Sequence, residues 1–172
     1  MLPGILLSAL LCGSFDASAT LGGVAPFGSL EFNHRGGVSG SIGVGLNQGA
    51  SHWELAGELQ RLPGNQQADY NLDLLRVSAG YHYALVNKID WQLRAGLAVD
   101  WNRLTRRLKA ATEYGSVFGG TVALTYVRSF GHPKFLFQLY GSELLDPGES
   151  GVTRAVQDAT IVGARFGVGY EF

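Results

Sequence analysis

The chain has 172 residues, 25 of them glycine, and 16% of its residues are charged. This length suits a single domain. Its 13 Lys and Arg residues nearly balance its 14 Asp and Glu residues. Net charge therefore gives no support for a nucleic-acid partner, and we expect none.

The N-terminus carries the one continuous apolar stretch, Leu2–Cys12, which is too short to span a bilayer as a helix. Ala17-Ser18-Ala19 follows it and has the small-x-small pattern of a signal cleavage site. No Lys or Arg precedes the stretch, which departs from an ordinary signal. We interpret residues 1–19 as a secretory signal peptide and residues 20–172 as the mature domain.

Cleavage after Ala19 would remove one acidic residue, Asp16, and no basic one. The mature charge would then be 13 − 13 = 0. It would also remove Cys12, the only cysteine of the chain. We therefore expect no disulfide framework.

Beyond this segment, apolar and polar residues alternate in eight stretches bounded by turn residues, which is the pattern of half-buried strands. The predicted strands are Ala25–Asn33, Gly37–Leu46, His52–Arg61, Leu72–Leu85, Trp91–Trp101, Ser116–Arg128, Phe135–Ser142 and Thr160–Phe172. Three connectors are short, namely 47–51, 86–90 and 129–134, and three are longer, namely 62–71, 102–115 and 143–159. An even strand number with alternating short turns and long loops is typical of a transmembrane barrel.

Alternation also fits a soluble barrel of the lipocalin kind, with the apolar face inside. The placement of the aromatic residues favours the membrane. On the apolar faces they gather at the two ends of the strands. Those near the short turns are Trp53, Tyr81, Tyr83, Trp91, Tyr126, Phe135, Phe137, Tyr170 and Phe172. Those at the other end are Phe32, Trp101 and Phe118. Two aromatic girdles around an aliphatic band indicate lipid interfaces. We predict an all-β, eight-stranded antiparallel up-and-down transmembrane barrel.

The opposite face, rich in Gly, Ser and Ala, suits a narrow interior. Its charged residues are Glu54, Glu58, Arg76, His82, Arg94, Asp100, Arg165 and Glu171. Isolated buried charges are costly, so we expect a salt-bridged network that plugs the lumen. The hairpin registers predict a Glu58–Arg76–Asp100 cluster and place His82 near Arg94. Eight strands leave room for side chains but not for an aqueous channel, which argues against a porin.

The last segment, Arg165–Phe172, places Phe166, Val168, Tyr170 and Phe172 on one face. This ending resembles that of small outer-membrane barrels of the OmpA/OmpX type. The resemblance implies that the terminal Phe and the alternating apolar residues before it serve as an assembly signal. It also implies a bacterial outer-membrane location, and lipid and the barrel-assembly machinery as partners.

Some eight-stranded outer-membrane barrels modify lipid A, as do the PagL and PagP families. A PagL-like site would need His and Ser two residues apart on one strand face, and no His-x-Ser occurs in the chain. Ser78 and His82 share a face but lie roughly 13 Å apart along the strand, too far for a hydrogen bond. Thr20–Val24 is too short for the amphipathic helix of a PagP-like protein. We therefore expect no catalytic residues, and we predict no cofactor or metal.

The segment Asn102–Lys109 follows the upper aromatic Trp101 and is predicted to be a basic outer loop. The candidates for contact with lipopolysaccharide are Arg35, Arg103, Arg106, Arg107 and Lys109, with Arg61 and Arg154 at the same rim. Arginine is well shaped for paired hydrogen bonds to phosphate. The alternatives are a solvated loop with acidic neighbours such as Glu113, or a receptor-binding surface as in the Ail branch.

These observations predict a structural or surface-interaction role in the outer membrane, through membrane integrity, lipopolysaccharide contact or adhesion. The alternatives are a lipid A-modifying enzyme and a barrel subunit of a larger envelope complex.

Overall fold

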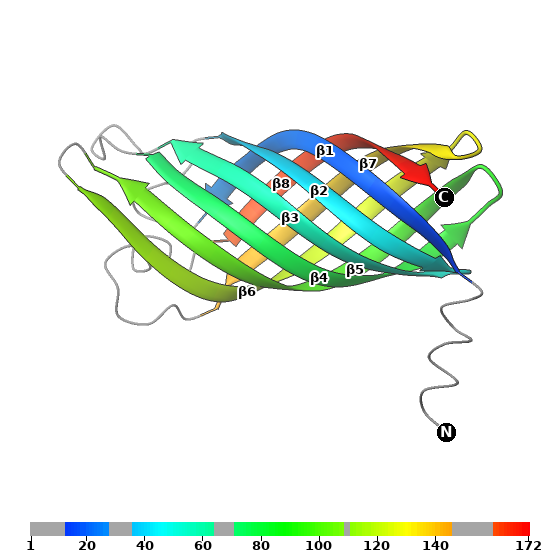
Figure 1. Ribbon diagram of the computed structural model, residues 1–172, viewed down its shortest axis with the longest axis horizontal. Helices are drawn as coiled ribbons and strands as arrows, with labels where there is room; N and C mark the ends of the chain where they lie inside the picture. Colours follow the sequence, from blue (N-terminus) through cyan, green and yellow to red (C-terminus); the bar gives the residue numbers. More distant parts are fainter. Residues whose placement is uncertain (1–12, 28–35, 64–70, 109–110, 146–159) are drawn as a thin grey trace, which may run out of the picture.

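The computed structural model describes residues 13–27, 36–63, 71–108, 111–145 and 160–172, which form a closed barrel of eight antiparallel strands (Figure 1). The strands are β1 (Ser14–Phe27), β2 (Gly37–Gln48), β3 (Ser51–Pro63), β4 (Asn71–Asn87), β5 (Trp91–Arg107), β6 (Thr112–Ser129), β7 (Pro133–Leu144) and β8 (Thr160–Glu171). Each strand pairs with the next, and β8 pairs with β1. Closure leaves no strand edge unpaired, so the predicted fold class is confirmed.

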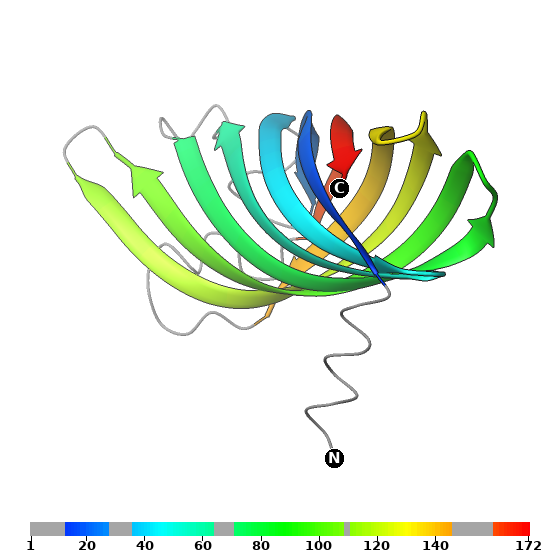
Figure 2. The ribbon, with the colours of Figure 1, turned by 45° about the vertical axis from the view of Figure 1, so that its right-hand side comes forward.

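Figure 2 shows the strands curving around one interior. The part of the chain that the structure describes contains no helix long and apolar enough to cross a membrane.

The two ends of the barrel differ. One end, here the turn end, carries the tight connections β2–β3, β4–β5 and β6–β7, as predicted. Gly49 and Gly131 adopt positive φ angles of 64° and 84° in two of these turns, a conformation that glycine adopts without strain. The C-terminus lies at this end, close to the start of β1 (Figure 1). The opposite end, here the loop end, carries the other connections.

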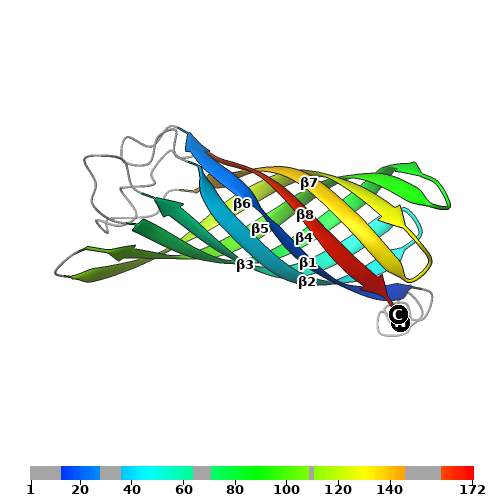
Figure 3. The ribbon, with the colours of Figure 1, turned by 90° about the horizontal axis from the view of Figure 1, so that it is seen from above.

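The β5–β6 hairpin differs from its prediction. Asn102–Arg107 continues β5 and Thr112–Gly115 begins β6, so most of the predicted loop 102–115 is strand. The paired strands extend beyond their neighbours at the loop end (Figure 3). The prediction failed because the polarity of the two faces inverts in this part of the strands. Outward residues such as Arg103 are charged and inward residues such as Leu104 are apolar, so the pattern no longer continues that of the lipid-facing part.

The first strand is also earlier than predicted. β1 covers Ser14–Phe27, whereas the prediction was Ala25–Asn33, of which residues 28–33 lie outside the described residues. Ser14–Ala19 pairs with β2, and Asp16–Ala19 also pairs with β8. Cleavage after Ala19 would therefore remove almost half of the closing strand. Small residues that suit a cleavage site also suit this strand, because Ala17 and Ala19 face outward between larger side chains.

The outer wall of the barrel is apolar over a broad belt. Its large exposed side chains include Leu21, Ile42, Val44, Trp53, Leu55, Leu59, Val77, Leu97, Val99, Phe118, Val122, Phe166 and Val168. Several are more than half exposed, for example Leu97 at 67% and Ile42 at 71%. A belt of this extent would be an aggregation surface in water but suits hydrocarbon, where every backbone group must pair within the protein.

The polarity of wall and lumen inverts near the loop end. In the wall, the cross-strand row Val77, Trp101 and Phe118 is apolar, whereas Arg61 and Asp73, paired further toward the loop end, are charged. In the lumen the order is reversed, because Arg76 and Asn102 are polar while Leu74 and Leu104, one row further on, are apolar and fully buried.

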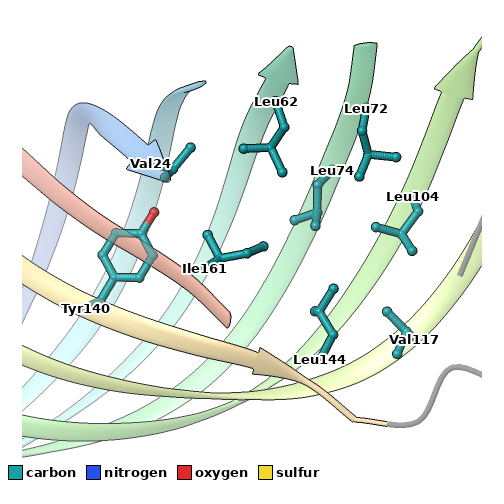
Figure 4. Packing of buried hydrophobic residues seen from close by; sticks show 9 residues of the cluster. All are labelled: Val24, Leu62, Leu72, Leu74, Leu104, Val117, Tyr140, Leu144 and Ile161. Atoms are coloured by element: carbon teal, nitrogen blue, oxygen red, sulfur yellow. The ribbon is translucent and has the colours of Figure 1, made fainter. Parts of the chain in front are cut away.

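These lumen leucines belong to the hydrophobic core of the protein, which lies inside the loop end of the barrel (Figure 4). Its members are Val24, Leu62, Leu72, Leu74, Leu104, Val117, Tyr140, Leu144 and Ile161. The wall is charged where the lumen is apolar, as in a soluble domain, so the strands leave the hydrocarbon between Val77 and Asp73. The core closes the lumen at this end.

Candidate functional site: the lumen and the loop-end collar

The centre of the lumen is organised around Glu58, which is 4% exposed. Its Oε2 atom lies 3.3 Å from Arg76 Nη1 and 3.2 Å from Arg165 Nη1. Tyr140 donates its hydroxyl to Glu58 Oε1 at 2.9 Å, and the centroid of its ring lies 6.0 Å from the guanidinium group of Arg76 and 4.8 Å from that of Arg165. One carboxylate thus joins β3, β4, β7 and β8 across the barrel.

Both arginines also donate hydrogen bonds to uncharged polar side chains. Arg76 donates to Asn102 at 3.1 Å and to Ser142 at 2.7 Å, and Arg165 donates to Gln138 at 2.6 Å. Such partners offset the cost of burying charge. Sequence reasoning missed these uncharged members, because alternation shows which residues face inward but not which of them meet.

Asp100 does not have the partner that the sequence predicted. Its neighbour on β4 is Ser78, while Arg76 pairs with Asn102, so the predicted Glu58–Arg76–Asp100 cluster contains Arg165 in place of Asp100. Asp100 instead accepts a hydrogen bond from Thr121 at 2.5 Å. The error arises from register, which the hydropathy pattern of a hairpin fixes only to within two residues.

A second group of charges lies nearer the turn end. His82 Nε2 is 3.1 Å from Glu54, not beside Arg94 as predicted, because His82 faces Gly96 in the register. Arg94 donates to Gln92 at 2.8 Å and to Asn47 at 3.1 Å. The remaining predicted network member, Glu171, lies 2.6 Å from Lys134 Nζ.

Lys134 also lies 3.3 Å from Asp16, and both residues were absent from the predicted network. Asp16 was assigned to the leader peptide, and Lys134 to a turn. Only the pairing of β8 with both β1 and β7 shows that Asp16 and Lys134 lie close together.

The middle of the lumen contains two small spaces, and a wider opening of about 800 Å³ lies at the turn end, beside Arg94, Lys134 and Glu171. Two polar cavities of about 30 Å³ each share Glu54, His82, Gln138 and Arg165 in their walls. A space of this size holds about one water molecule. Side chains of the ion-pair network and of the apolar core occupy the described interior.

Charged side chains form a collar on the outer wall at the loop end, which we call the loop-end collar: Arg61, Asp73, Arg103 and Arg107. Arg61 donates to Asp73 from Nε at 2.7 Å and from Nη2 at 3.2 Å, and Arg107 Nε lies 3.3 Å from the same carboxylate. The hydrogen bonds from Arg61 hold the pKa of the Asp73 carboxyl below its usual range. Arg103 lies over the Tyr114 ring at 5.2 Å. The exposed guanidinium groups of Arg61 and Arg107 thus share one carboxylate.

The predicted basic residues divide into three groups. Arg103 and Arg107 are exposed on the wall and belong to the loop-end collar. Arg106 is half-buried and pairs with Glu113 at 2.5 Å, so its guanidinium group is not exposed on the wall as those of Arg103 and Arg107 are. Arg35, Lys109 and Arg154 lie outside the described residues. Asp73 was missing from the predicted rim. It lies two residues before Leu75 on β4, and this spacing places it on the outer wall with Leu75.

The histidines do not form a site on the lipid face. His52 and His82 lie in the lumen with ring centroids 5.6 Å apart, and His132 lies in the turn between β6 and β7. His34 lies outside the described residues. Among the residues that the structure describes, no cluster of three or more His, Cys, Asp or Glu side chains could hold a metal ion.

The comparisons with known proteins find likeness in structure and none in sequence. No protein-family model matches the chain, and no curated protein matches it. The chain is similar to neisserial surface protein A, NspA, with a TM-score of 0.75 and 13% identity over 93% of this chain and 99% of that chain. It is similar to Ail, the attachment invasion locus protein of Yersinia pestis, with a TM-score of 0.56 and 13% identity over 93% and 97%. The N-terminal β-barrel domain of Pseudomonas aeruginosa OprF gives a TM-score of 0.52 and 14% identity over 93% and 99%.

These likenesses define a class of protein. The chain has the fold of the small, eight-stranded outer-membrane β-barrels, and the predicted resemblance to the OmpA/OmpX-like group is confirmed at the level of fold. The apolar belt and the closed barrel are those of bacterial outer-membrane proteins.

Proposed function

We propose that the protein is a structural barrel of the bacterial outer membrane that binds lipopolysaccharide phosphates through its loop-end collar. The observation that carries this proposal is the position of Arg61, Arg103 and Arg107 directly beyond the apolar belt. At that height an outer-membrane barrel meets the phosphate groups of the outer leaflet.

The chemistry of the collar supports the proposal. Guanidinium groups bind phosphate oxygens through paired, charge-assisted hydrogen bonds. One carboxylate, Asp73, holds two of the three arginines in place without neutralising all of them. Arg103 stacks on Tyr114, which fixes its direction.

A soluble polyanion is the second candidate ligand for the same arginines. Ail has been solved in complex with the heparin analogue sucrose octasulfate. That complex shows a polyanion bound by a barrel of this fold, and the exposed loop-end collar of this protein offers suitable charge. Surface binding of this kind would serve adhesion.

The test compares purified lipopolysaccharide binding by the barrel in detergent with binding by the triple variant Arg61→Gln, Arg103→Gln, Arg107→Gln. The variant should bind at least about tenfold more weakly, because each lost charge-assisted hydrogen bond contributes more than an ordinary one. Added salt should weaken wild-type binding and affect the variant less.

The matched control is Arg128→Gln at the turn end. Arg128 is partly exposed, pairs with Asp90 at 2.9 Å and lies over the Phe130 ring at 5.9 Å. Its substitution should leave binding unchanged. Equal binding by the wild type and the triple variant would contradict the proposal, and competition by a sulfated glycan but not by lipopolysaccharide would favour adhesion.

A further inference from the structure

The outer wall of the barrel carries an apolar groove of about 770 Å³, which we call the wall groove. It lies on the lipid-facing side across β8, β1, β2, β3 and β4. Its sides are formed by Leu21, Ile42, Leu59, Leu75, Phe166 and Val168. The cross-strand register places Leu21, Gly40, Leu59 and Leu75 in one row, so a glycine lies between two leucines.

The floor of the wall groove exists because two outward positions lack side chains. Gly57 lies between Ile42 and Val77 in the register, and a Cβ atom at Gly57 would meet no atom within 4 Å. Packing of the barrel therefore does not require glycine at this position. At Gly40 a Cβ atom would approach Leu21 to 3.1 Å, so that position is tighter.

The loop-end collar meets one end of the wall groove. Arg61 follows Leu59 on the same face of β3, and Arg103 is the direct cross-strand partner of Leu75. Both guanidinium groups are exposed, whereas the groove beside them is apolar. A ligand that fits both parts has an acyl chain along the wall and an anionic group at the height of the collar.

We propose that the wall groove holds an acyl chain of lipopolysaccharide whose lipid A phosphate binds Arg61 and Arg103. The inference rests on the proposed function and adds a defined site for the lipid on β8 and β1–β4. Charge complementarity at the loop end selects a phosphate-bearing lipid of the outer leaflet. Burial of the chain adds an apolar contribution that salt does not screen.

The decisive variant is Gly57→Leu, which fills the wall groove and changes no charge. Gly57→Ala fills it less. The control is Gly120→Leu, an outward position on β6 between Val99 and Glu143, where a Cβ atom would come no closer than 3.9 Å to Ala98 O. Binding of purified lipopolysaccharide is measured in detergent for each variant, after its unfolding transition has shown that it folds like the wild type.

Gly57→Leu should bind about tenfold more weakly, a change of ~1.4 kcal/mol, with the salt dependence of the wild type retained. Gly57→Ala should fall between the wild type and Gly57→Leu, and Gly120→Leu should bind as the wild type does. If Gly57→Leu and Gly57→Ala bind normally while the triple arginine variant is impaired, the wall groove is not the site and the proposed function stands.

A second arm replaces lipopolysaccharide with phosphatidylglycerol. Lipopolysaccharide should be bound more tightly than this phospholipid, and the preference should shrink in Gly57→Leu. Equal affinity for the two lipids would overturn the choice of occupant. If neither the arginine variant nor the groove variants change binding, both the site and the proposed function fail.

Discussion

Glu58 on β3 and Arg165 on β8 form an ion pair across the lumen, with Oε2 and Nη1 3.2 Å apart. The same carboxylate oxygen faces Arg76, so one acidic group compensates two buried guanidinium groups. Strands that do not touch in the sheet are thereby linked through the interior.

Glu58→Ala should destabilise the refolded barrel by about 3–5 kcal/mol, because it leaves two buried cations without their shared partner. Urea unfolding in detergent measures the change. Glu143→Ala is the control, since Glu143 is exposed on the wall. If Glu58→Ala lowers the free energy of unfolding no more than Glu143→Ala does, water in the lumen solvates both arginines.

Leu97→Arg should cost about 2–4 kcal/mol, as expected for a cation near the bilayer midplane on the lipid face. The residue is 67% exposed within the apolar belt. Thr105→Arg, on the same face of β5 but at the height of Asp73, should cost much less. Both are measured by unfolding in lipid vesicles, and equal costs at the two positions would contradict the proposed membrane boundary.

The ion pairs of Asp73 in the loop-end collar should contribute less to the stability of the folded protein in acid. The pKa of Asp73 is lowered in the folded protein by the hydrogen bonds of Arg61, so its stabilising contribution is present above the unfolded-state pKa. That contribution is lost as the pH falls through the folded-state pKa. Asp73→Asn should therefore remove part of the acid-induced loss of stability between neutral pH and pH ~3, measured by unfolding at several pH values. An unchanged pH profile would show that the pair contributes nothing.

The start of β1 can be tested by truncation. A chain beginning at Gly13 should refold to a barrel, whereas one beginning at Thr20 should not close, because it lacks Ser14–Ala19 and their pairs on β2 and β8. It also lacks Asp16, a partner of Lys134. Circular dichroism and the gel mobility of unboiled samples report closure. Equal folding of the two chains would support cleavage after Ala19 as the boundary.

Phe172 should matter more for assembly than for stability. The residue is 74% exposed and its backbone N–H donates to Phe15 O at 2.9 Å, a contact that any residue except proline could make. Phe172→Asp should therefore reduce insertion in cells far more than it lowers the unfolding free energy of refolded protein. Ile89→Asp, at an exposed apolar position in the β4–β5 turn, controls for added charge. Equal effects of Phe172→Asp in the two assays would make Phe172 only a packing residue.

The sequence by itself determined the fold class, seven of the eight strands and the direction of their faces. Within hydrocarbon, outward side chains such as Leu55 and Leu97 must be apolar, and inward ones such as Arg76 and Arg165 can be polar, so the pattern repeats every second residue. The start of the first strand was missed because Ala17 and Ala19 carry so little hydrophobic signal that the same residues suit a cleavage site.

Only the tertiary structure decided which inward residues meet and where the strands leave the membrane. Closure of β8 on β1 brings Arg165 to Glu58 and Lys134 to Asp16, contacts between segments that no local pattern connects. The inversion of polarity beyond Val77 likewise depends on a lumen shared by all strands: Leu74 is buried by residues from several of them, while Asp73 beside it faces outward. A single strand carries only its own alternation, so these relationships exist only in the closed barrel.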